Sequence, residues 1–129
     1  MTDLPLHFEA TTIIDGSAES VFAVADEPDL LTRHMSEPSL MMGGGSMQCK
    51  LDGLAGKAVG SVICLTGKGF GFAIALDEII EERAPPLRKV WATIGTPQLV
   101  VIRDYRMGFE IAEVVMGCQL RVWIDYALP

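Results

Sequence analysis

Apolar and polar residues alternate along most of this chain, and such a period of two is typical of half-buried β-strands. The first alternating stretch covers residues 6–14, where Leu6, Phe8, Ala10 and Ile14 share one face. Further alternating or β-rich stretches, separated by turn residues, predict about six more strands. They lie at residues 47–52, 61–66, 70–80, 87–94, 99–112 and 118–128. Consecutive strands with short turns form an antiparallel meander.

The segment after the first strand follows a helical period instead. Apolar residues recur at i, i+3, i+4 and i+7 between Ala18 and Ala25, and Ser17 before them is a favourable N-cap. Pro28 ends this helix and suits the first turn of a second short one that reaches Met35. We therefore expect an α+β fold: a curved antiparallel sheet of about seven strands, with two short helices between strands one and two.

Three local features interrupt the simple pattern. Ile79 and Ile80 are adjacent and change the phase of the alternation, so we expect a β-bulge near residues 77–78. The Gly-Thr-Pro segment at 95–97 predicts a turn that ends its strand. Trp91 and Trp123 alternate with polar neighbours, which favours the outer face of the sheet or a position near an interface.

Composition indicates a single domain over residues 1–129 with an excess of apolar residues. Half of the residues are apolar and mean hydropathy is +0.34, while the charged fraction of 21% is ordinary for a globular protein. No apolar run reaches the ~18 residues of a membrane helix, and the N-terminus has no secretory signal pattern, so a cytoplasmic protein is expected. Apolar excess of this kind indicates apolar surface turned toward a cavity or a partner.

Charge and chemistry exclude several classes of function. The net charge is -7 and the ten Lys and Arg residues are scattered, so nucleic acid and anionic membrane surfaces are not expected partners. Cys49, Cys64 and Cys118 form no zinc pattern and are expected to be buried thiols. A phosphate-binding loop leads into the start of a helix, and neither glycine-rich stretch, at 43–46 or at 67–71, is followed by a predicted helix. We therefore expect no metal and no cofactor.

One predicted strand combines polar and apolar side chains on the same face. Arg103, Tyr105, Met107 and Phe109 have the mixture of a mostly apolar pocket with a few orienting polar groups. Arg103 either pairs with an acidic or enolate oxygen of a ligand or lies at the sheet rim. His7 is expected to face solvent, and no catalytic set can be assembled. The candidate ligand-contacting residues are Phe72, Arg103, Tyr105, Met107, Phe109, Val122 and Tyr126.

Several strings in this order resemble the SRPBCC superfamily of helix-grip, START and birch-pollen-allergen-like domains, and within it the polyketide cyclase/dehydrase-like group. They are Ser-Ala-Glu-Ser-Val-Phe at 17–22, Glu-Glu-Arg-Ala-Pro-Pro at 81–86, Lys-Val-Trp at 89–91, Tyr-Arg-Met-Gly-Phe-Glu-Ile at 105–111 and the closing stretch 120–129. The resemblance covers essentially the whole chain. It implies a sheet wrapped around a long C-terminal helix, with an apolar cavity between them, and His34 would then lie near the cavity mouth.

The end of the chain departs from that pattern, because the expected long helix would follow the last strand and the sequence stops at Leu128-Pro129. Either the chain is a piece of a longer protein, or the cavity is covered in another way. The first functional hypothesis is binding or carriage of a small hydrophobic molecule. An alternative is a polyketide cyclase, aromatase or dehydratase-like enzyme, with Tyr105 or Tyr126 as acid/base and Arg103 holding an oxyanion. A third is an interaction module or homodimer that uses the exposed sheet.

Overall fold

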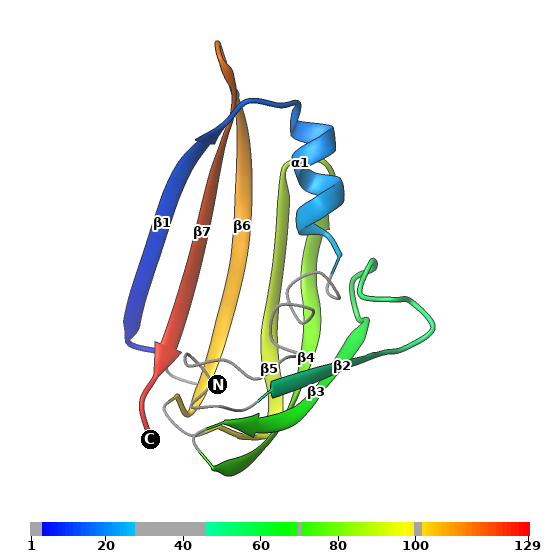
Figure 1. Ribbon diagram of the computed structural model, residues 1–129, viewed down its shortest axis with the longest axis vertical. Helices are drawn as coiled ribbons and strands as arrows, with labels where there is room; N and C mark the ends of the chain where they lie inside the picture. Colours follow the sequence, from blue (N-terminus) through cyan, green and yellow to red (C-terminus); the bar gives the residue numbers. More distant parts are fainter. Residues whose placement is uncertain (1–3, 28–45, 70, 100–101) are drawn as a thin grey trace.

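The computed structural model describes residues 4–27, 46–69, 71–99 and 102–129, in which one helix packs on one antiparallel sheet (Figure 1). The helix is α1 (Ala18–Ala25), and the strands are β1 (Leu6–Ile14), β2 (Ser46–Leu51), β3 (Val62–Gly69), β4 (Phe72–Ala84), β5 (Arg88–Gln98), β6 (Asp104–Val114) and β7 (Gly117–Ala127). The strand order is β1-β7-β6-β5-β4-β3-β2, so the first strand pairs with the last. The expected curved antiparallel α+β fold is confirmed, while the predicted second helix and His34 fall outside the described residues.

Helix α1 forms as its sequence predicts. The Ser17 hydroxyl accepts a hydrogen bond from the backbone N–H of Ser20 at 3.1 Å, which satisfies one of the free donors of the first turn. Ala18 and Phe22 are buried beneath the helix, and the Phe22 ring meets that of Phe109 on β6 edge-on, with centroids 5.6 Å apart. We call the face of the sheet that carries α1 the inner face and the opposite one the outer face.

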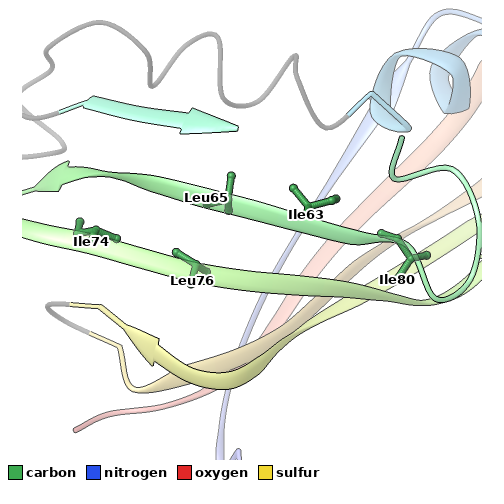
Figure 2. Close-up of a cluster of buried hydrophobic side chains, with 5 residues drawn as sticks. All are labelled: Ile63, Leu65, Ile74, Leu76 and Ile80. Atoms are coloured by element: carbon green, nitrogen blue, oxygen red, sulfur yellow. The ribbon is translucent and has the colours of Figure 1, made fainter. Parts of the chain in front are cut away.

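Two apolar clusters on the inner face form the core. The first lies between β3 and β4, where Figure 2 shows five side chains along the two strands: Ile63, Leu65, Ile74, Leu76 and Ile80. The second lies under α1 and consists of Ala18, Phe22, Phe109, Ile111 and Cys118. Trp91 on β5 packs against both clusters.

The two tryptophans therefore lie on opposite faces, and the outer-face position expected for Trp91 is wrong. Trp91 pairs with Met107 in the β5–β6 register and its ring lies 6.1 Å from that of Phe109, on the inner face. The prediction took the polar residues Lys89 and Thr93, which share the face of Trp91, as a sign of the outer face. Lys89 in fact points inward, where it contacts Asp26. Trp123 does lie on the outer face, where it packs over Gly108, its partner on β6.

The irregularities of β4 and β5 differ in part from those expected. Register shifts occur between Ala75 and Asp77 and between Ile80 and Glu82, but the burial alternation of β4 stays in phase through residue 80. The second shift inserts one extra residue in β4, so Arg83 points to the inner face toward α1. The predicted turn at 95–97 is wrong: β5 continues to residue 98, and a left-handed Gly95 (φ 68°) accommodates the irregular register. The next strand begins at residue 104 rather than 99.

Candidate functional site

A row of polar side chains crosses the middle of the inner face, and we call Glu78, Thr93, Tyr105 and Tyr126 the polar row. Glu78 pairs with Thr93 between β4 and β5, and Tyr105 pairs with Tyr126 between β6 and β7. The Thr93 hydroxyl joins the two halves, because it accepts from the backbone N–H of Tyr105 at 3.1 Å and lies 3.2 Å from the carbonyl oxygen of Tyr105. The four residues therefore stand side by side on four neighbouring strands.

A row of apolar side chains lies directly beside the polar row. The same strand pairing aligns these side chains, which occupy the next inner-face position along each strand. They are Ile80, Trp91, Met107, Ile124 and, on β1, Phe8. Their exposure rises across the sheet, from 1% for Ile80 to 65% for Phe8. The apolar row is thus buried at its β4 end and accessible to a ligand at its β1 end.

The polar row contains a buried carboxyl group. Glu78 is only 7% exposed, it lies between Leu76 and Ile80 of the first cluster, and the hydroxyl of Tyr105 donates a hydrogen bond to its Oε2. Burial raises the pKa of the Glu78 carboxyl, against the opposing effects of the Tyr105 hydrogen bond and the charge of Lys89. Burial and the adjacent Glu78 also raise the pKa of the Tyr105 hydroxyl, which therefore stays protonated.

A second buried carboxyl group lies nearby with the opposite kind of surroundings. Asp26, at the C-terminal end of α1, accepts hydrogen bonds from Arg83 Nε at 3.1 Å, Arg83 Nη2 at 2.8 Å and Lys89 Nζ at 2.8 Å. Burial acts to raise the pKa of Asp26, but these donors outweigh it and lower the pKa below its ordinary value. Lys89 also donates to the Asp26 carbonyl oxygen, at 3.0 Å. This cluster fixes α1 onto the inner face, on the opposite side of the apolar row from the polar row.

The residues singled out from the sequence occupy different parts of this face. Tyr105 and Tyr126 belong to the polar row, and Met107 belongs to the apolar row beside it. Phe109 is 3% exposed and lies beneath α1, next to its half-buried partner Val122 on β7.

The other two lie apart from the rows. Phe72 begins β4 and is 63% exposed. The Arg103 side chain, just before β6, is 52% exposed, and its Nε donates a hydrogen bond to the adjacent Asp104 at 2.9 Å. Arg103 therefore has the rim position that was one of its two expected placements.

Sequence reasoning missed Glu78 and Thr93, although one signal was present. Ile74, Leu76, Glu78 and Ile80 alternate strictly, so a carboxylate stands where the pattern calls for an apolar side chain. The neighbouring Ile79 suggested a change of phase that would have turned Glu78 outward. Thr93 carries no comparable signal, because its role depends on the pairing of β5 with β6.

The outer face carries paired charges rather than a second candidate site. A hollow of about 520 Å³ there is lined in part by Glu81, Arg106 and Asp125. Arg106 pairs with Glu81 at 2.7 Å, and Asp125 pairs with His7 at 2.5 Å. In the described part of the chain, no group of three or more His, Cys, Asp or Glu residues is placed to hold a metal ion, and no helix there is long and apolar enough to cross a membrane.

The sequence matches no family model and no curated protein, but solved structures share its fold. Protein CV1439 from Chromobacterium violaceum is 17% identical over 95% of this chain and 81% of that chain, with a TM-score of 0.67. Ginseng major latex-like protein 151 from Panax ginseng is 14% identical over 98% of this chain and 81% of its own, with a TM-score of 0.68. The di-domain ARO/CYC StfQ from the steffimycin biosynthetic pathway is 10% identical, with a TM-score of 0.68 over 95% of this chain and 37% of its own. The chain therefore shares its fold with these proteins, and the helix-grip-like fold expected from the sequence is confirmed.

Proposed function

We propose that the protein binds a small hydrophobic molecule against the inner face of its sheet. The observation that carries this proposal is the apolar row, which is buried at β4 but half-exposed at Met107 and Ile124 and more exposed at Phe8. An apolar surface with a few polar groups beside it is the usual lining of a small-molecule site. Each 100 Å² of apolar surface that a ligand covers here contributes about 2.5 kcal/mol before the costs of association.

The shared fold is compatible with this proposal but does not choose the ligand. StfQ is named as a di-domain ARO/CYC from the steffimycin biosynthetic pathway, whereas the ginseng protein is named only as a major latex-like protein. Fold alone does not decide between a binding protein and an enzyme. The side chains of the inner face must therefore carry the distinction.

A cyclase or dehydratase-like reaction is the second candidate, and Glu78 is the observation that favours it. A buried carboxyl group in an apolar setting, with its pKa raised by burial, is a suitable proton carrier for such a reaction. Tyr105 is less suited to act as a base, because its pKa is raised and its proton is shared with Glu78. Arg103, at the rim, is directed to Asp104 rather than to the polar row.

Ligand capture by the purified protein tests the first candidate. Native mass spectrometry with a panel of aromatic, polyketide-like and fatty compounds should detect one-to-one complexes. Met107→Glu, which places a charge in the apolar row, should weaken binding at least tenfold. Ala112→Glu, on the exposed outer side of the same strand, should leave it unchanged.

Two other outcomes of the same measurement have clear meanings. Absence of binding across the panel would contradict the proposal. A dimer that excludes every ligand would instead favour an interaction between two copies through the exposed sheet. Conversion of a bound polyketide-like compound that is lost in Glu78→Gln would favour the enzyme.

A further inference from the structure

Glu78 is the most unusual group on the inner face, because a carboxylate is costly to bury without a cation. In the described part of the chain, no Lys or Arg nitrogen lies within ion-pair distance of Glu78, and the Tyr105 hydroxyl donates a hydrogen bond to its carboxylate. Lys89 is the nearest candidate cation, but its Nζ donates to Asp26 instead. One oxygen of the carboxylate, Oε1, therefore has acceptor capacity that no described side chain uses.

The hydrogen-bonding capacity of the pair is one-sided. An ionised carboxylate only accepts hydrogen bonds, and the single proton of the Tyr105 hydroxyl is already directed to Glu78 Oε2. What the pair still offers to a neighbour is thus lone pairs on Glu78 Oε1 and on the Tyr105 oxygen. Because the polar row lies directly beside the apolar row, a polar substituent on a molecule that covers the apolar row would face these lone pairs.

We propose that the Glu78–Tyr105 pair selects hydrophobic ligands that carry a hydrogen-bond donor, namely an alcohol or a phenol, and rejects ligands that carry a carboxylate. This inference rests on the proposed binding function and adds the chemical class of the ligand. A hydroxyl group can donate to the pair, an ether or ester of the same shape cannot, and a carboxylate meets a buried like charge. Sites built around a buried polar group reject analogues that leave it unpaired.

Three probes of nearly equal shape separate these cases: 2-naphthol, 2-methoxynaphthalene and 2-naphthoate, measured by equilibrium dialysis at pH 8. A hydrogen bond to a charged group contributes about 1.5–3 kcal/mol, so 2-naphthol should bind at least ~10-fold more tightly than 2-methoxynaphthalene. The carboxylate should bind more weakly than either neutral probe. In Glu78→Gln the carboxylate should gain affinity and the preference for 2-naphthol should shrink several-fold.

The outcomes distinguish the inference from the function beneath it. Equal binding of the three probes to the wild type, or an unchanged preference in Glu78→Gln, would overturn the proposed selectivity and leave hydrophobic binding standing. Failure of all three probes to bind would contradict the binding function and the selectivity together. Ala112→Glu serves as the matched control, because this substitution lies on the outer face and should keep the wild-type order of the probes.

Discussion

Neutralising the two buried carboxylates of the inner face should change stability in opposite directions. Asp26 lies between Arg83 and Lys89, whereas Glu78 meets the neutral hydroxyl of Tyr105. Asp26→Asn strands the Lys89 ammonium, whose side chain is 3% exposed, beside the guanidinium of Arg83. Glu78→Gln removes a desolvated charge and retains a side-chain oxygen that can accept from Tyr105.

The magnitudes follow from the burial of each group. Removing one partner of a buried ion pair costs about 3–5 kcal/mol. With an unfolding entropy of roughly 2.1 cal/mol/K per residue, that corresponds to a fall in Tm of about 11–19 °C for a chain of this length. Glu78→Gln should instead raise the free energy of unfolding by an amount on the order of 1 kcal/mol at pH 8. Adding Lys89→Met to Asp26→Asn should recover much of the loss, since it removes the stranded cation.

The pH dependence gives each effect a signature. The folded-state pKa of Asp26 is lowered from 3.8, so its stabilisation is present above the unfolded pKa and is lost as pH falls through the folded one. The folded-state pKa of Glu78 is raised from 4.5, so its contribution is fully present below 4.5 and is lost as pH rises through the folded value. The gain in unfolding free energy from Glu78→Gln should therefore appear only at pH values above the folded-state pKa of Glu78.

Urea unfolding followed by circular dichroism at pH 5 and pH 8 measures both variants. A loss of less than about 1 kcal/mol in Asp26→Asn would contradict the expected coupling of this buried pair. Destabilisation by Glu78→Gln at pH 8 as strong as that by Asp26→Asn would contradict the opposite signs expected for the two carboxylates. Met107→Glu and Ala112→Glu are not informative for this comparison, since each adds a charge rather than removing one.

Three further predictions concern other parts of the fold. Gly108→Ala should cost about 1–3 kcal/mol, because its Cβ would lie 2.6 Å from the Lys89 carbonyl oxygen, whereas Gly53→Ala meets nothing within 4 Å and should be neutral in the same thermal melt. His7→Gln should flatten the stability profile above pH 6.5, since hydrogen bonds with Asp125 and Glu9 raise the pKa of His7 and that stabilisation is lost as pH rises through the folded value. Glu9→Gln should flatten the profile between pH 4.5 and 2, because hydrogen bonds from Arg121 and His7 lower the pKa of Glu9 to about 2. Profiles unchanged by either substitution would show that these outer-face contacts do not form in solution.

The helix and the faces of the strands could be predicted from the sequence, because they depend on residues that are close together along the chain. The cap at Ser17 and the stripe of α1 depend on residues within one helix, and the structure confirms both. Alternation likewise placed Tyr105, Met107 and Phe109 on one face of β6.

The errors arise where long-range pairing decides the outcome. Trp91 and Lys89 point inward because β5 is covered by α1 on that face, and Glu78 is buried because β3 and β5 flank it. The extra residue that turns Arg83 inward is a property of the β4–β5 register and not of either strand alone.

The position of the ligand is tested most directly by the two tryptophans on opposite faces. Trp91 belongs to the apolar row, and Trp123 packs over Gly108 on the outer face. Trp123→Phe leaves Trp91 as the sole tryptophan, and Trp91→Phe leaves Trp123, so excitation at a wavelength that tyrosine does not absorb reports one face at a time. Titration of each variant with a non-fluorescent hydrophobic ligand found by native mass spectrometry compares the two faces.

Binding at the inner face predicts a saturable change in intensity and wavelength of Trp91 emission, with Trp123 emission unchanged at the same occupancy. A response of Trp123 with none from Trp91 would place the ligand on the outer face and contradict the proposed site.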